Sequence, residues 1–221
     1  MDIQNQLAEE KVLQKAYQLK KKSKWLYFIG ACLVLGSIAF VSIKHHYERQ
    51  ETKAHNAMFQ AVYYFEQEDW TKALHGDDIY LGFLDLIKQF PKTKAANLAY
   101  FYLGNIYLHQ QQQDKALVHL LKFKTKDKLL HPRTLSLIAD VYCDKEKYPQ
   151  AIKYYQKAVA LHPTTTLNAQ YIFKLALAYE ANKQYAAAIK SFKQIIKKYP
   201  SSMYFNEAKK HKSRLKTYIV K

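Results

Sequence analysis

Two short groups of polar side chains could do chemistry in this sequence. His45 and His46 are adjacent and could bind a transition metal or titrate near neutral pH. Gly76-Asp77-Asp78 could offer carboxylates to a cation, but a single acidic turn supplies fewer oxygen ligands than calcium requires. A polar pair beside an apolar segment, and a loop that interrupts a helix, are the simpler interpretations. We therefore expect no metal site and no cofactor.

The sequence contains none of the common catalytic motifs. It has no Gly-rich phosphate loop, no paired-His zinc motif and no nucleophile elbow. Its two cysteines, Cys32 and Cys143, lie far apart in the sequence, so we expect two free thiols. We expect a protein that is not an enzyme and has no small-molecule substrate.

Composition favours helices and disfavours a nucleic-acid partner. Only five Gly and five Pro occur in 221 residues, whereas strand-rich folds need frequent turn residues. The net charge of +17 is carried almost wholly by Lys, because Arg occurs only at Arg49, Arg133 and Arg214. Arg is the preferred side chain for bidentate phosphate and base contacts, so we expect no specific nucleic-acid binding. A solvated basic surface, or attraction to anionic lipid, explains the surplus of Lys equally well.

Residues 25–43 form an uncharged apolar segment that predicts a transmembrane helix. At 1.5 Å per residue these 19 positions span roughly 28 Å, about the thickness of the hydrocarbon core of a bilayer. Trp25 and Tyr27 lie where an interfacial aromatic belt would. Six Lys precede the segment, and only Lys44, Arg49 and Lys53 follow it closely. This asymmetry predicts a cytoplasmic N-terminus and an extracytoplasmic (periplasmic) remainder, in a single-pass protein of the cytoplasmic (inner) membrane.

Three other interpretations of this segment remain open. A cleaved signal peptide would have a shorter N-terminal region and a shorter apolar core. Residues 29–32 nearly match a lipoprotein signal that ends at Cys32, although apolar residues follow where a polar tether would be expected. A buried core helix would leave the flanking Lys cluster unexplained. We favour an uncleaved anchor.

Three later segments repeat one spacing of small and large apolar residues. The small positions Gly104, Ala139 and Ala176 are 35 and 37 residues apart. This pattern resembles the tetratricopeptide repeat, a helix–turn–helix unit in which small residues let the two helices pack closely. The residues that we expect to form this packing are Gly104, Tyr107, Ala116, Ala139, Tyr142, Ala151, Ala176, Tyr179 and Ala188.

The pattern predicts an all-α protein, with a transmembrane helix followed by a right-handed tetratricopeptide superhelix. Ala57, Ala61 and Tyr64 suggest a degenerate first repeat, whose second helix is interrupted after Ala73. Residues after the last repeat are amphipathic and Lys-rich, as a capping helix would be. The expected segments are a cytoplasmic Lys-rich helix 1–24, the span 25–43, a juxtamembrane linker 44–53, a degenerate repeat 54–92, repeats 97–130, 132–165 and 169–202, and a capping helix 203–221.

The run KALHGDDIYLGFLDLIKQFPKTKAANLAYFYLGNIYL resembles membrane-anchored tetratricopeptide proteins of the Bacteroidetes type. The likeness includes the Gly-Asp insertion after Ala73, Gly82-Phe83 and the short anchor behind a Lys-rich N-terminus. In layout the chain is also similar to the ancillary subunit of the bacterial Sec translocon. Because a shared layout carries function only weakly, the resemblance implies no catalytic residues and no particular client.

The resemblance also implies a concave groove lined by fixed positions of the first helix of each repeat. Only Asn105 fits the pattern of families that grip a carboxylate, so we expect apolar contacts at both ends and polar contacts between them. Neighbouring repeats or the capping helix could instead cover Phe101, Leu108 and Phe173. The expected groove residues are Met58, Val62, Phe65, Leu98, Phe101, Asn105, Leu108, His109, Arg133, Asp140, Phe173, Leu177 and Glu180.

Together these features predict a non-catalytic, membrane-tethered scaffold that binds polypeptide on the outer face of the cytoplasmic membrane. Its partners would be exported clients and the Sec translocon, in an accessory role in protein export. The alternative is a dedicated structural subunit of an envelope assembly or cell-division complex, with one fixed partner.

Overall fold

The computed structural model describes the backbone of residues 2–161 and 166–218, and the side chains of 10–11, 13–15, 17, 32–161 and 167–218. Within these ranges the regular structure is helical, apart from one isolated antiparallel bridge between Gly76 and Leu81. The chain divides into two units, Met1–Lys53 and Ala54–Lys221. The expected all-α class is confirmed for the described residues.

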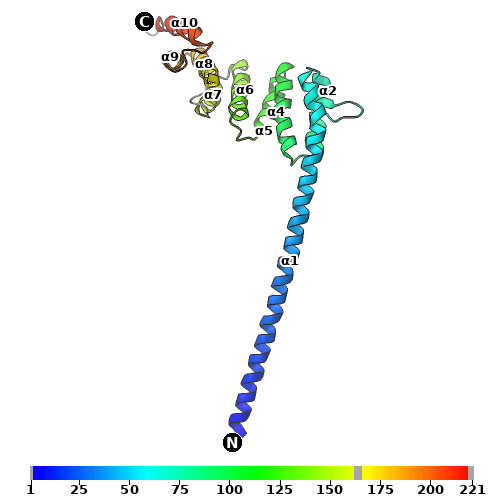
Figure 1. The fold of residues 1–221 in the computed structure, drawn as a ribbon. Helices are drawn as coiled ribbons and strands as arrows, with labels where there is room; N and C mark the ends of the chain where they lie inside the picture. Colours follow the sequence, from blue (N-terminus) through cyan, green and yellow to red (C-terminus); the bar gives the residue numbers. More distant parts are fainter. Residues whose placement is uncertain (1, 162–165, 219–221) are drawn as a thin grey trace. The chain divides into compact units, whose positions relative to one another are not determined.

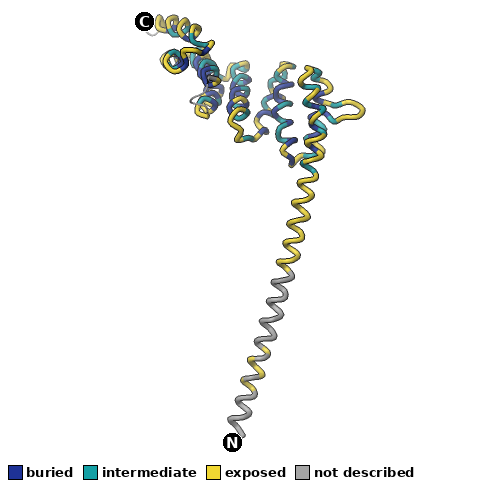
Figure 2. The backbone as a smooth tube through the Cα atoms, in the orientation of Figure 1, coloured by how far each residue is buried: buried dark blue, intermediate teal, exposed yellow. Residues whose placement is uncertain are grey.

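The first unit consists of one helix, α1 (Asp2–Glu66), which continues into the second unit. Residues 44–53, which we expected to form a linker, are helical. The apolar side chains at 33–35, 38, 40–41 and 43 are exposed, as Figure 2 shows along this part of α1. Among the described residues, no helix combines the length and the apolar composition needed to cross a bilayer. Of the expected span 25–43, the side chains of 25–31 lie outside the described ones.

The second unit is a series of paired helices that follow one another along the chain (Figure 1). The pairs are α4 with α5, α6 with α7, and α8 with α9, and α10 packs against α9. The helices after α1 are α2 (Trp70–His75), α3 (Phe83–Gln89), α4 (Lys94–His109), α5 (Gln113–Lys122), α6 (Leu130–Asp144), α7 (Tyr148–Leu161), α8 (Thr166–Ala181), α9 (Tyr185–Lys198) and α10 (Phe205–Lys216). The first helices of the three clear repeats begin two or three residues before the expected boundaries.

The first helix of each repeat ends in the same backbone turn. One residue in each turn has φ between 56° and 59°, in the left-handed region; these residues are Glu68, Gln111, Glu146 and Lys183. The next residue donates its N–H to a tyrosine carbonyl five positions earlier, at 2.8 to 3.0 Å; the accepting residues are Tyr64, Tyr107, Tyr142 and Tyr179. This is the Schellman arrangement, which satisfies carbonyls that the end of a helix leaves free. The turn after Tyr64 therefore identifies the end of α1 as the first helix of a fourth, degenerate repeat.

Small residues allow the two helices of a repeat to approach closely. A Cβ on Gly104 would lie 2.5 Å from both Cγ and Cδ2 of Leu120 on α5, and Leu120 is itself buried. The corresponding Ala139 and Ala176 are fully buried, as are Ala116, Ala151 and Ala188 on the second helices. Tyr107 is buried, and Tyr142 and Tyr179 are half-buried beside these positions. Closely packed interiors leave no room for larger side chains here.

The buried apolar residues form three clusters. The first joins the end of α1 to α2, α3 and α4 and includes Phe83, Leu86 and Leu103. The second is built by α6, α7 and α8 around Ala139 and Tyr155. The third joins α8, α9 and α10. The junction of α5 with α6 separates the first cluster from the second, and there the helices pack less extensively than they do within a repeat.

Replacing Lys183 with Gly should stabilise the fold by about 0.5–1 kcal/mol, because Gly adopts a left-handed backbone without a steric penalty. The matched control is Lys190→Gly, at an exposed position inside α9, which should destabilise by about 1 kcal/mol. Urea unfolding of the full-length chain, followed by circular dichroism, measures both. Equal destabilisation by the two substitutions would contradict the assigned turn.

Candidate protein-binding surfaces

The structure places several of the expected groove residues inside the repeats. Met58, Phe101 and Asn105 are buried. The Asn105 side-chain amide donates to the Phe101 carbonyl at 2.7 Å, within α4. Val62, Phe65, Leu98 and Leu108 are half-buried and pack against the first core cluster. These residues therefore offer little surface to a ligand.

The expected apolar contact at the far end of the groove is partly covered by the C-terminal segment. The Phe173 ring stacks on Tyr204 at a centroid distance of 5.0 Å and meets the His211 ring edge-on at 5.8 Å. Glu180 pairs with His211 at 3.1 Å between Oε2 and Nδ1, and its Oε1 accepts from Arg214. The side chains of α10 thus occupy the part of the row formed by Phe173 and Glu180.

The polar middle of the expected groove is also engaged internally. Asp140 Oδ2 accepts from Lys174 Nζ at 2.7 Å, and Asp140 Oδ1 accepts from the Tyr155 hydroxyl. Burial and the Asp140 carboxylate raise the pKa of Tyr155, which keeps its hydroxyl a donor. Burial also raises the pKa of the Cys143 thiol, which makes it a poor nucleophile. These contacts join α6, α7 and α8.

Three expected groove residues remain available at the surface. Arg133 is exposed and lies over the Phe101 ring at 5.8 Å. His109 is exposed, and its ring stacks on Trp70 at 4.7 Å. Leu177 is exposed on α8. The exposed groove residues are therefore separate side chains, whereas the spacing predicted a groove with apolar contacts at both ends and polar contacts between them.

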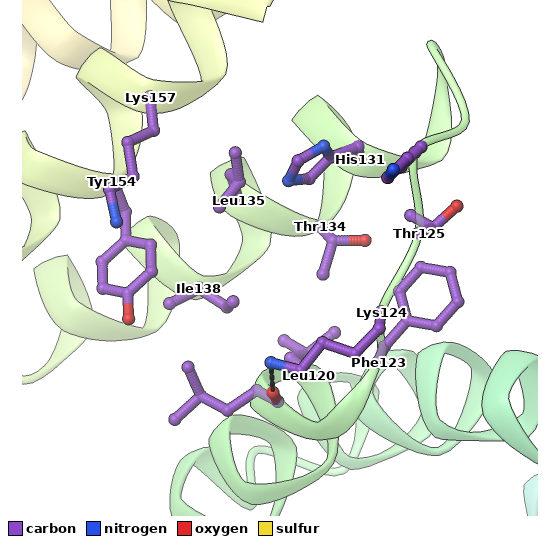
Figure 3. A pocket seen from close by; sticks show the side chains of 12 residues that line it. Leu120, Phe123, Lys124, Thr125, His131, Thr134, Leu135, Ile138, Tyr154 and Lys157 are labelled. Atoms are coloured by element: carbon purple, nitrogen blue, oxygen red, sulfur yellow. Dashed lines mark hydrogen bonds between the residues drawn. The ribbon is translucent and has the colours of Figure 1, made fainter.

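A pocket opens on the surface between the first and second clear repeats (Figure 3). We call it the inter-repeat pocket; its volume is about 690 Å³. Leu120 and Ile138 are buried at its base, and Leu135 and Tyr154 add apolar surface from α6 and α7. The full lining is Leu120, Leu121, Phe123, Lys124, Thr125, Lys126, His131, Thr134, Leu135, Ile138, Tyr154 and Lys157.

Hydrogen bonds hold the connection from α5 to α6 that forms one wall of this pocket. The Asn97 side chain accepts from Lys124 N at 3.0 Å and donates to Lys124 O at 2.7 Å. Asp127 Oδ1 accepts from the N–H groups of Leu129 and Leu130, both at 2.8 Å. The carboxylate thus caps the start of α6. The wall is therefore formed before any ligand arrives.

The inter-repeat pocket combines apolar surface with positive charge. Lys124, Lys126, Lys157 and His131 line it, and none of its lining residues is acidic. Lys124 Nζ donates to the Leu121 carbonyl at 3.0 Å, while Lys126 has no carboxylate partner among the described residues. Such a site favours a ligand that joins apolar groups to negative charge.

The sequence pattern did not predict this pocket, because its residues lie outside the helix positions that define the groove. Most belong to the second helix of one repeat, the connection after it, and the outer face of the next repeat. One signal was present: α5 has only ten residues, and Lys124, Lys126 and Lys128 follow it before α6 begins. A short second helix with a long basic connection indicates a wider junction.

The described side chains form no cluster of His, Cys, Asp or Glu that could hold a metal ion. Cys32 is exposed and Cys143 is half-buried, and neither is in a disulfide. The arrangement supports binding through apolar and charged side chains.

The paired helices with identical turns define the second unit as an α-helical repeat array. Comparison with family models agrees: residues 98–127 and 131–201 each match a model described as tetratricopeptide repeat. Residues 98–127 and 131–201 therefore form tetratricopeptide repeats, and the described fold is an all-helical tetratricopeptide superhelix. No curated protein sequence matches the chain.

Several solved structures share this fold at low sequence identity. YrrB, a TPR protein with an unusual peptide-binding site, has a TM-score of 0.59 and 16% identity, over 73% of this chain and 75% of its own. A MamA protein has a TM-score of 0.57 and 18% identity, over 75% of this chain and 87% of its own. MamA from Desulfovibrio magneticus RS-1 has a TM-score of 0.55 and 19% identity, over 68% of this chain and 77% of its own. At these identities the likeness shows the fold alone.

Replacing Glu180 with Gln should loosen α10, because His211 and Arg214, its two partners on that helix, lose the carboxylate. For a partly exposed pair worth about 1 kcal/mol, amide exchange in α10 should accelerate about fivefold, while exchange in α4 stays unchanged. Glu146→Gln is the charge-matched control, because Glu146 is exposed and forms no ion pair with the described residues. Hydrogen exchange with mass spectrometry measures both variants. Unchanged exchange in α10 would show that apolar packing alone holds it.

Proposed function

We propose that this chain is a non-catalytic scaffold that binds polypeptide, tethered to the cytoplasmic membrane with its repeats on the outer face. The observation that carries the binding role is the inter-repeat pocket, with its apolar base and cationic lining. A polypeptide segment with large apolar and acidic side chains fits this chemistry. The fold shared with YrrB, a TPR protein with an unusual peptide-binding site, is consistent with this role.

The proposed membrane tether is supported by the sequence of residues 25–43 and by the exposed apolar side chains of α1. Residues 25–43 carry no charge, and six Lys precede them. The described part of that segment exposes Leu33, Leu35 and Phe40. A helix that is apolar on all sides needs an apolar environment, which a bilayer supplies. The excess of Lys before the segment favours a cytoplasmic N-terminus.

Thiol labelling tests this topology. With Cys32 and Cys143 replaced by Ser, a cysteine is introduced at Leu13 or at Met203, both of which are strongly exposed. We expect an impermeant maleimide to label Met203→Cys in cells with a permeabilised outer envelope, and to label Leu13→Cys only after lysis. Labelling of both positions only after lysis, or the reverse order, would contradict the proposed orientation.

Photocrosslinking in cells tests the binding role. A photoreactive residue at Leu121, which lines the pocket, should yield polypeptide adducts. The matched control is Val118, on the same helix and exposed at 52% against 38% for Leu121, but outside the lining. A third probe at Leu177 tests the exposed part of the expected groove.

The identity of the crosslinked proteins distinguishes an accessory of protein export from a dedicated structural subunit. Many exported proteins together with translocon subunits would support an accessory of protein export through the Sec translocon. One discrete partner would support a dedicated subunit of an envelope or cell-division complex. Adducts from Leu177 alone would move the site to the groove. Absence of adducts at both positions, or equal adducts from Val118, would overturn the binding role.

A further inference from the structure

The loop 76–82, between α2 and α3, presents two large apolar side chains to solvent. Ile79 is 80% exposed and Tyr80 is 48% exposed. In Figure 1 this loop extends outward after α2. Single exposed apolar residues are common, but two at the tip of one protruding loop suggest a contact surface.

Internal contacts hold this loop in one conformation. Asp77 Oδ1 accepts from Ile79 N at 2.9 Å and from Tyr80 N at 2.7 Å, and Asp77 N donates to Tyr80 O at 3.0 Å. The Tyr64 hydroxyl donates to Asp77 Oδ2, which holds the pKa of this carboxyl below its usual range. Since these bonds form before any encounter, little conformational entropy remains to be lost on binding.

Gly76 and Gly82 lie at the two ends of the loop, which together form its neck. Gly76 has φ +76°, and a Cβ there would lie 2.1 Å from Tyr80 O. A Cβ on Gly82 would lie 2.4 Å from Gly76 N and from Leu74 O. The backbone strands of the neck are therefore in contact, and the tip is held away from the helices.

The tip is acidic as well as apolar. Asp77 is engaged by Tyr64 and by the turn, while Asp78 is exposed and has no ion-pair partner among the described residues. The sequence Asp-Asp-Ile-Tyr thus combines negative charge with an aliphatic and an aromatic side chain. The inter-repeat pocket presents the complementary combination: an apolar base, Lys124, Lys126, Lys157 and His131, and no acidic lining residue.

We propose that the inter-repeat pocket binds the 76–82 loop of a second copy of this chain, head to tail. None of the residues that line the pocket comes from the loop, and the two features belong to different repeats of one chain. Ile79 and Tyr80 contact the accessible apolar surface of Leu121, Leu135 and Tyr154, and Asp78 faces Lys126. The inference rests on the proposed function, because it names the polypeptide that occupies the pocket.

This contact is heterologous, since a loop on one copy meets a pocket on the next. Each copy added head to tail leaves one loop and one pocket free, so the contact generates an open row of copies or, where the rotation closes, a ring. A loop of this size buries less area than a standard stable interface, and association in dilute solution is weak. Attachment of the copies to one membrane raises their effective concentration and offsets this weakness.

Disulfide crosslinking of the full-length chain reconstituted in lipid vesicles tests the contact. One tagged copy carries Ile79→Cys, a differently tagged copy carries Leu135→Cys, and both carry Cys32→Ser and Cys143→Ser. We expect a mixed-tag dimer under mild oxidation. Met203→Cys replaces Ile79→Cys in the matched control, because Met203 is equally exposed at 84% but lies outside the loop.

Exchanging the charges of Asp78 and Lys126 tests whether these two side chains pair across the contact. Asp78→Lys in the Ile79→Cys copy should lower the crosslink yield about fivefold, as should Lys126→Glu in the Leu135→Cys copy. The two changes together should restore most of the yield. A yield from Met203→Cys equal to that from Ile79→Cys, or no rescue by the double change, would overturn the proposal.

Failure of the contact between two copies can be distinguished from failure of the proposed scaffold function. No crosslink from Ile79→Cys, together with foreign polypeptide adducts from Leu121 in cells, would overturn the second-copy occupant and leave the scaffold role intact. Strong crosslinks between copies, with adducts from Leu121 consisting only of this chain, would support self-association and contradict binding of other polypeptides.

Discussion

The repeat array depends on one backbone turn, in which a residue with positive φ lets the next N–H reach a tyrosine carbonyl five positions earlier. This bond ends the first helix of each repeat and reverses the direction of the chain. The second helix therefore packs against the small residue of the first helix. None of the four residues in the left-handed region is glycine. Each turn therefore contains a strained residue, and the packing of the two helices compensates for the strain. The degenerate repeat has the same turn, although its second helix is split.

The junction after α5 differs from the others, and the binding surface arises there. A short second helix brings its basic connection across the space that a longer helix would fill, and Asn97 fixes that connection to α4. Leu135 and Tyr154 are only half-buried there, where a fuller interface would bury them. The same junction separates the first core cluster from the second. An opening in the core and a cluster of Lys side chains thus have one structural origin.

The concave groove shows how internal contacts compete with ligand binding. Asp140 is held by Lys174 and Tyr155, and Glu180 by His211 and Arg214. A ligand at these positions would have to replace formed, partly buried ion pairs, which costs more than filling an open pocket. Among the described residues, neither Asp78 at the loop tip nor Lys126 in the pocket forms an ion pair. The complementary charge and shared apolar character of the loop tip and the pocket make them the natural place for contacts between molecules.

The sequence by itself determined the all-α class and the tetratricopeptide repeats, because the recurrence of Gly104, Ala139 and Ala176 reports a packing requirement that any such fold must meet. It could not determine which groove residues are free. Whether Phe101 and Phe173 are exposed depends on neighbours such as Phe123 and Tyr204, which helical spacing does not specify. Likewise, residues from α5, α6 and α7 line one pocket only because a ten-residue helix leaves space beside it. Local periodicity therefore fixed the elements, and tertiary packing decided which surfaces remained open.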